Sequence, residues 1–229
     1  MKKPVVDYRT FRLSKLNDPQ FSHLKLLFGW LGYFSLYFLT EQLIPVEKCY
    51  PVHCWIDDVI PFHEIFLIPY VFWYLLIIFS LVYFALYDIE SFKSLQTFII
   101  ITQIIAMVAY ITFPSRQDLR PVEFPRDNFL TSVVGFIYSV DTNTGVCPSL
   151  HVGYSLGIAS VWLKNKTMSD RFRIPWKIFV VIAVILICLS TMFIKQHSAV
   201  DFFAALPMCL FAELFVYRKR YFCRRARLS

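Results

Sequence analysis

Two residues near the end of the sequence could form the reactive half of a catalytic site. His197 and Asp201 are four positions apart, a spacing that places both side chains on one face of a helix. A carboxylate in that place can accept the Nδ1 proton of the imidazole and leave Nε2 free as a nucleophile or base. The pair therefore predicts the histidine and orienting acid of a catalytic triad.

A second histidine follows a helix-start signal. Pro148 and Ser149 precede His151 by three and two positions, and proline is favoured in the first turn of a helix. The unpaired backbone N–H groups of that turn, together with the Ser149 hydroxyl, predict an anion site beside His151.

Three cations lie near these two segments in the predicted layout. Arg116 and Arg120 carry guanidinium groups that could bind phosphate oxygens in a forked geometry, and Lys195 lies two residues before His197. Phosphoryl transfer without a metal needs a nucleophile, a carboxylate that orients it, a second histidine and cations. These segments supply all four. Two other readings stay open: histidines that merely sit at a membrane boundary, and a metal site of two histidines and one carboxylate. We expect no metal and no cofactor.

The elements that must position these residues are apolar helices. Hydrophobic residues make up 57% of the 229 residues and charged residues only 17%, which excludes a water-soluble fold and a disordered chain. A helix needs about 20 apolar residues to cross a bilayer. Six runs meet or approach that length: Leu26–Ile44, Ile65–Tyr87, Leu95–Phe113, Pro148–Leu163, Ile174–Ile194 and Ala199–Tyr217. We predict a single all-α integral membrane domain over residues 1–229, a bundle of six transmembrane helices.

The distribution of charge predicts the orientation of this bundle. Eighteen of the 23 Lys and Arg residues fall on one side if both termini are cytoplasmic, in the tails 1–25 and 218–229 and in alternate connections. The positive-inside rule therefore places both termini in the cytoplasm and the two histidines on the extracytoplasmic face. The net charge of +7 is then mostly topological. Nucleic-acid binding is disfavoured, because the basic C-terminal run directly follows an apolar span.

Several features of the connections leave alternatives open. Cys49 and Cys54 could form a disulfide in an extracytoplasmic loop or remain small apolar residues. Asp57 and Asp58 could contact a polar head group or belong to a solvated loop. The segment Asp127–Val140 has apolar residues at helical spacing behind a capping Asp127, which predicts an amphipathic surface helix bordering a lateral opening for lipid.

These motifs resemble the three signature blocks of the type 2 phosphatidic acid phosphatase superfamily. Pro148, Ser149 and His151 match the second block in full, and Arg120-Pro121 matches the end of the first. Ser190, His197 and Asp201 fall at the spacing of the third block. The chain departs from the pattern at Phe113 and Thr191, which stand where the family has Lys and Arg.

The same departures occur in the branch that resembles fungal inositol phosphorylceramide synthase and animal sphingomyelin synthase, which Cys147–Val152, Lys195–His197 and Ile56–Phe62 also resemble. The resemblance implies that His197 forms a phosphohistidine, that Asp201 holds its ring, and that His151 protonates the leaving alkoxide. It further implies a phosphate site from Arg120, Ser149 and Ser190, with Arg116 and Lys195 as substitutes for the missing cations.

The expected substrate is a lipid phosphate ester, and membrane lipids are the expected partners. If water accepts the phosphoryl group the enzyme is a lipid phosphatase, which we favour at this point because hydrolysis is the superfamily's commonest activity. If a lipid alcohol accepts it, the enzyme is a head-group transferase. A lipid-binding or transport protein is a more remote alternative, for which Glu213 within the last span is a candidate residue. The sequence does not give the oligomeric state.

Overall fold

The computed structural model describes the backbone of residues 4–225 and the side chains of residues 4–218. The rest of the predicted tails, residues 1–3 and 226–229, lie outside the described residues. The helices are α1 (Phe28–Leu43), α2 (Trp55–Val59), α3 (Leu67–Tyr87), α4 (Ile89–Thr112), α5 (Phe129–Val140), α6 (Leu150–Lys164), α7 (Asp170–Phe193) and α8 (Ala199–Arg225). Short 3₁₀ turns are η1 (Tyr8–Thr10), η2 (Leu13–Lys15), η3 (Ser22–Leu27), η4 (Val46–Lys48) and η5 (Glu64–Phe66). Strands β1 (Tyr50–Pro51) and β2 (Ser115–Arg116) form one parallel pair.

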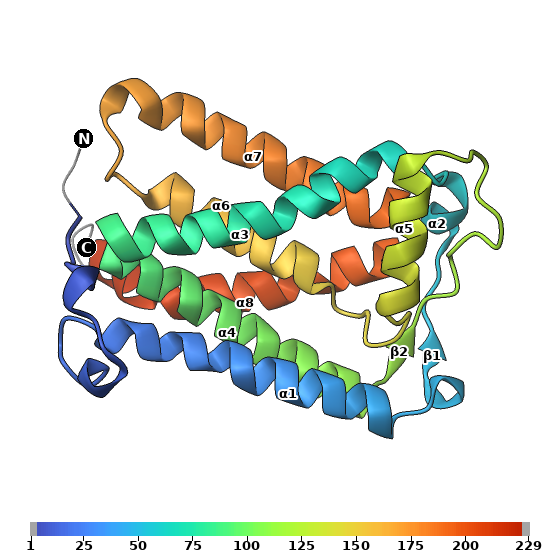
Figure 1. Cartoon of the computed structure of the whole chain (residues 1–229), viewed down its shortest axis with the longest axis horizontal. Helices are drawn as coiled ribbons and strands as arrows, with labels where there is room; N and C mark the ends of the chain where they lie inside the picture. The colour runs from blue at the N-terminus through green and yellow to red at the C-terminus, as the bar shows by residue number, and fades with distance from the viewer. Residues whose placement is uncertain (1–3, 226–229) are drawn as a thin grey trace.

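Six of the described helices, α1, α3, α4, α6, α7 and α8, run lengthwise and form a bundle (Figure 1). The short helices α2 and α5 and the two strands lie together at one end, called here the capped end. The start of α1 and the end of α8 lie at the opposite end, called here the tail end. All three connections that carry the predicted site residues are therefore at the capped end.

Among the described residues, four helices are long and apolar enough to cross a membrane. They are η5 with α3, α4, α7, and α8 as far as Arg218. Large apolar side chains on their outer surfaces are exposed, among them Leu75, Ile182 and Leu210. Helix α1 is apolar yet has no buried residue. Such a surface is unfavourable in water and suits a hydrocarbon environment, so the chain is an all-helical membrane protein.

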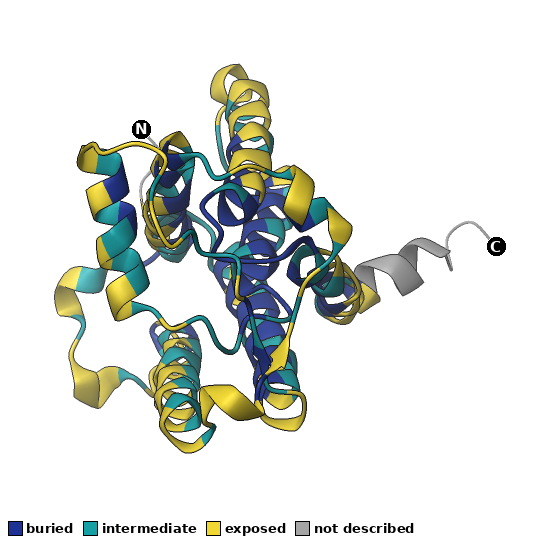
Figure 2. Cartoon of the chain, turned by 90° about the vertical axis from the view of Figure 1, so that its right-hand side faces the viewer, coloured by how far each residue is buried: buried dark blue, intermediate teal, exposed yellow. Residues whose placement is uncertain are grey.

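Helices α1 and α6 are shorter than the other four. They have 16 and 15 residues, or about 24 and 22 Å at 1.5 Å per residue. Helix α6 is the centre of the bundle and packs against α3, α4, α7 and α8, which explains its small residues. A Cβ atom on Gly157 would come within 2.6 Å of the Phe98 ring on α4, so glycine is needed for this close approach. Figure 2 shows the buried centre surrounded by partly exposed helices.

Several helix boundaries differ from the sequence predictions. Helix α4 begins six residues before the predicted Leu95, because Asp88 caps its first turn by accepting a hydrogen bond from Ser91 N at 3.1 Å. Helix α5 confirms the predicted surface helix, but its cap is Asn128, which accepts from Thr131 N, and not Asp127. The segment before α1 is folded rather than a free tail: Tyr8 Oη donates to Ala85 O at 2.9 Å.

Candidate active site

His197 and Asp201 form the expected pair, although not on one helix. His197 lies in the connection between α7 and α8, and Asp201 lies in the first turn of α8. His197 Nδ1 is 3.1 Å from Asp201 Oδ2, which also accepts the backbone N–H of Ser198 at 2.9 Å. Asp201 is fully buried and His197 is 8% exposed. The Asp201 carboxylate, which orients the His197 ring, is thus itself held by a backbone N–H of the residue that follows His197.

His151, the second residue of α6, faces His197. Its Nδ1 atom is 3.2 Å from His197 Nε2. Its ring stacks on Tyr70 and packs against Trp73, both from α3, at centroid distances of 4.9 and 4.2 Å. Asp201 accepts a hydrogen bond from the Nδ1–H of His197, which leaves His197 Nε2 without a proton. The proton in the hydrogen bond between the two histidines is therefore assigned to His151 Nδ1, with His197 Nε2 as the acceptor. The residues predicted as nucleophile and proton donor are therefore in direct contact.

The start of α6 is fixed to the start of α8 through the backbone. Ser149 N donates to Asp201 O at 3.1 Å, and Tyr110 Oη donates to Pro148 O at 2.8 Å. Ser149 is the N-cap of α6, so Pro148 precedes the helix rather than occupying its first turn. The fully buried Ser149 hydroxyl accepts from Val152 N of its own helix. As a phosphate ligand, Ser149 stays a prediction.

Arg120 reaches the site but binds the protein around it. Its guanidinium donates to the carbonyl oxygens of Tyr138, Asp141 and Thr142 and to Gln196 Oε1, at 2.8 to 3.1 Å. It therefore holds the connection after α5 against the residue that precedes His197. This bonding uses four of its five N–H groups.

The other predicted phosphate ligands are directed elsewhere. Arg116 donates to Asp118 and to the carbonyl oxygens of Val46 and Cys49. Lys195 Nζ donates to the carbonyl oxygens of Asp57 and Ile60. The buried Ser190 hydroxyl donates to Ile187 O within α7. None of these three side chains is among the residues that line the cavity described next.

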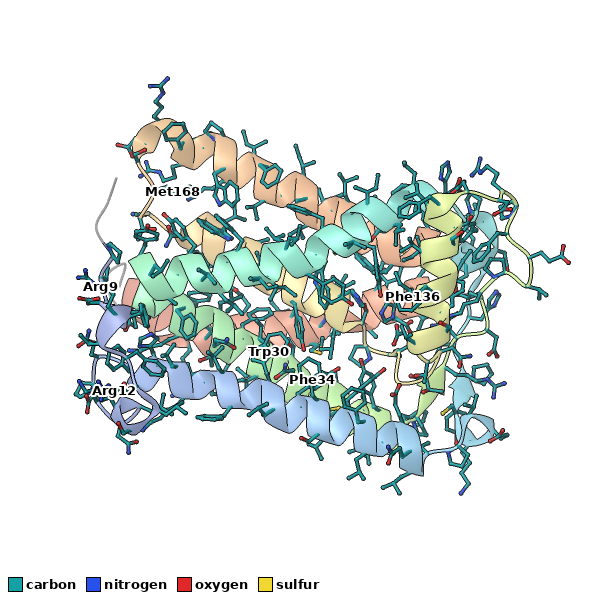
Figure 3. All side chains as sticks on the ribbon, viewed as in Figure 1. Arg9, Arg12, Trp30, Phe34, Phe136 and Met168 are labelled. Atoms are coloured by element: carbon teal, nitrogen blue, oxygen red, sulfur yellow. The ribbon has the colours of Figure 1, made fainter. Side chains whose placement is uncertain are left out.

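A cavity of about 700 Å³ leads to the two histidines from the side of the bundle. Helices α1 and α3 form its walls, and Trp30 and Phe34, labelled in Figure 3, lie on the α1 side. Its lining runs from Leu27 to Glu41, about 20 Å along the helix axis. The walls are mostly aromatic and aliphatic, while His151, His197, Gln196, Glu41, Asp141 and Thr142 gather at the capped end.

Helix α5 closes the capped end of this cavity. Ile137 and Val140 contribute to the lining, and Tyr138 Oη donates to Ile194 O at 2.6 Å. The other end of α5 is fixed by Glu64, whose carboxylate binds Arg126 at 2.8 Å and Asn128 at 3.0 Å. The predicted amphipathic helix therefore borders the cavity that reaches the site.

Sequence reasoning missed Gln196, Glu41 and Asp141 as residues of the site. Gln196 had a signal, because it adjoins His197, whereas the two carboxylates lie in segments without a motif. Glu213, the candidate residue for a transport role, pairs with Lys164 of α6 at 2.7 Å. Cys49 and Cys54 are both free thiols. Among the described residues, no group of three or more His, Cys, Asp or Glu side chains is placed to hold a metal ion.

Comparison with known proteins gives no match for the chain among family models, curated proteins or solved structures.

Proposed function

We propose that this protein is a membrane enzyme that transfers the phosphoryl group of a lipid phosphate ester through a phosphohistidine on His197. The observation that carries the proposal is the hydrogen-bonded series Asp201, His197 and His151 at the polar end of an otherwise apolar cavity. The resemblance of the motifs to the type 2 phosphatidic acid phosphatases agrees with it.

In the first step, His197 Nε2 attacks phosphorus while the ester P–O bond breaks. The departing alkoxide takes the proton from His151 Nδ1, so His151 enters this step as an imidazolium and leaves it as a neutral imidazole. Asp201 accepts the hydrogen bond from the Nδ1–H of the phosphorylated His197 ring. In the second step, the oxygen of water or of a lipid alcohol attacks phosphorus and the P–N bond breaks. The incoming hydroxyl gives its proton to His151, which returns the site to its starting state.

The 3.2 Å between the two histidine nitrogens describes the site before substrate enters. In-line attack places phosphorus about 3 to 3.5 Å from Nε2, with the leaving oxygen on the opposite side of phosphorus. His151 must then donate from beyond that oxygen, so the two nitrogens must move apart. The entering phosphate replaces the hydrogen bond between the histidines.

The charges near the site favour a phosphodiester over a phosphomonoester. Arg116 and Lys195, the substitutes for the missing family cations, bind the protein itself, and Arg120 is largely engaged. Among the described residues that line the cavity there is no Lys or Arg, whereas Glu41 and Asp141 are present. A diester carries one negative charge, and a monoester carries up to two. These contacts favour head-group transfer over the phosphatase that the sequence favoured.

We also propose that all six lengthwise helices span the membrane, with the capped end extracytoplasmic. The 3₁₀ turn η3 continues directly into α1 and lengthens it to Ser22–Leu43. Helix α6 is enclosed by four other helices, so it does not need the full bilayer thickness. The charge bias of the connections supports both termini in the cytoplasm. The gap between α1 and α3 then gives lipid a lateral route from the bilayer to His197.

One assay tests the reaction and the acceptor. Purified protein in detergent is given phosphatidic acid or a phosphodiester lipid, each with and without ceramide or diacylglycerol, and the products are followed by mass spectrometry. A new head-grouped lipid that depends on the added alcohol supports transfer. Release of inorganic phosphate from phosphatidic acid, or of a phosphorylated head group from the phosphodiester, supports hydrolysis. Turnover that survives His197→Ala contradicts the proposal.

A further inference from the structure

Asp57 is a buried carboxylate in a short helix, α2, whose other residues are exposed or half-buried. It is 4% exposed and lies in α2, in the connection between α1 and α3. Oδ2 accepts from the backbone N–H of Cys54 at 2.9 Å and from Ser198 Oγ at 2.6 Å. Oδ1 accepts from the backbone N–H of Ala199 at 2.8 Å. All the described partners of the Asp57 carboxylate are thus hydrogen-bond donors. Two of them, Ser198 and Ala199, lie where α8 begins.

These contacts lead directly to the histidine pair. Ser198 donates its hydroxyl to Asp57 Oδ2 and its backbone N–H to Asp201 Oδ2. Ala199, the other partner of Asp57, is the first residue of α8, where free N–H groups favour a negative charge. Asp57 therefore caps the helix that presents Asp201 and fixes the residue that follows His197.

Lys195 attaches the other end of the same loop to α2. Its Nζ donates to Asp57 O at 2.8 Å and to Ile60 O at 2.6 Å. Its backbone has φ of 55°, a left-handed conformation that is unfavourable for a residue other than glycine. The loop 195–198 is thus held on both sides by one helix from a distant part of the chain.

The ionised state of Asp57 fits this arrangement. Burial alone raises the pKa of its carboxyl group, but the hydrogen bonds from Ser198, Ala199 and Cys54 outweigh burial and lower the pKa. The charged groups nearest to it include Lys195, whose Nζ binds the Asp57 carbonyl. A carboxylate that accepts three hydrogen bonds fills the role of a fixed anchor.

We propose that Asp57 is a positioning residue, which holds the loop 195–198 so that His197 Nε2 points at the substrate phosphorus. The inference rests on the proposed function, since it assigns a role in the attack by His197. It replaces both sequence-based readings of this aspartate, because a buried side chain bonded to Ser198 is neither a head-group ligand nor part of a solvated loop. Asp57 does not line the cavity, so it acts through the loop and not on the substrate.

The adjacent aspartate gives a matched control. Asp58 has the same charge and lies on the same helix, but its side chain is 66% exposed and pairs with His53. Asp57→Asn puts an amide N–H₂ against at least one backbone N–H or the Ser198 hydroxyl, whereas Asp58→Asn disturbs only a surface pair. We expect kcat to fall about 100-fold in Asp57→Asn, as for a small misplacement of a reacting group. KM should stay within about twofold, and Asp58→Asn should resemble the wild type.

Leaving-group dependence separates the proposed positioning of His197 from the proton-donor role of His151. An aryl phosphodiester with a good leaving group needs no proton from His151, so it partly rescues His151→Ala. It should not rescue Asp57→Asn, because attack by His197 is impaired for every substrate. If Asp57→Asn does not fold in detergent, Ser198→Ala removes only the hydroxyl link, and kcat should fall about 5- to 10-fold with unchanged KM.

The proposal is overturned if folded Asp57→Asn, or folded Ser198→Ala where the first variant does not fold, keeps the wild-type kcat. It is also overturned if KM and not kcat carries the loss. Its failure is distinct from failure of the proposed function. If the wild type forms a phosphohistidine and Asp57→Asn forms it at the same rate, only the positioning role fails; if the wild type forms none, the reaction itself is wrong.

Discussion

His151 Nδ1 lies 3.2 Å from His197 Nε2, although 46 residues separate the two histidines. The contact joins the start of α6 to the α7–α8 loop, and the aromatic rings of Tyr70 and Trp73 hold the His151 ring in place. Apart from each other, the two histidines contact different groups. His197 binds a carboxylate, whereas His151 packs against aromatic rings. This asymmetry agrees with the proposed roles, in which His197 is the nucleophile and His151 the proton donor.

His151→Ala should therefore impair leaving-group departure rather than binding. We expect kcat for a lipid phosphodiester to fall about 10²- to 10⁴-fold, the usual contribution of a general acid. An aryl phosphodiester should recover most of the loss, because its leaving group departs without protonation. Steady-state rates for both substrates measure this. Equal losses on both substrates would remove His151 from the acid role.

Asp201→Asn should lower kcat about 10³- to 10⁴-fold while the fold is retained. The amide has the shape of the carboxylate, but it lacks the charge that stabilises the phosphorylated imidazole, and it can place N–H₂ against His197 Nδ1–H. Rates are compared with thermal unfolding in detergent. A folded Asp201→Asn enzyme with more than about a tenth of wild-type kcat would contradict this role.

Narrowing the cavity should discriminate between lipids by chain length. Ile78 and Leu75 of α3 are similarly exposed, at 59% and 60%, but only Ile78 lines the cavity. We expect Ile78→Trp to raise KM for a long-chain phosphodiester about 5- to 10-fold, with little effect on a short-chain analogue, and Leu75→Trp to change neither. If both variants change both substrates equally, the cavity is not the lipid route.

Asp141 should make stability depend on pH. Burial raises the pKa of its carboxyl group, against the opposing effect of Arg120. A raised folded-state pKa favours the neutral acid, so the associated stability is fully present below the unfolded-state pKa and is lost as pH rises through the folded-state value. Asp141→Asn should flatten that fall in unfolding temperature. Asp118→Asn controls for removing a half-exposed carboxylate at the same end. An unchanged wild-type slope in Asp141→Asn would contradict this prediction.

The sequence predicted the positions of the chemical groups better than their directions. The spacing of His197 and Asp201 predicted their hydrogen bond, although His197 precedes the helix, because residues just outside a helix still approach its first turn. The positions of Arg116, Arg120 and Lys195 in the sequence did not predict where their side chains point. Lys195 turns away from His197 because its backbone adopts a left-handed conformation, which no local pattern indicated.

Contacts between distant segments were beyond a reading of the sequence. Asp57 and Ser198 are 141 residues apart, and only the packing of α2 against the start of α8 brings them together. Similarly, the cavity between α1 and α3 depends on how far these helices stand apart, which their apolar composition does not determine. The surface helix α5 was predictable, because its apolar periodicity is a local property.

The most direct test of the account is to trap the covalent intermediate. Purified enzyme is mixed with a phosphodiester lipid, quenched in base to preserve a phosphoramidate, digested and analysed by mass spectrometry. We predict a phosphate-containing adduct on His197, absent from His197→Ala and accumulating in the wild type when no acceptor alcohol is added. Turnover of the lipid by His197→Ala, or an adduct on another residue, would contradict the account.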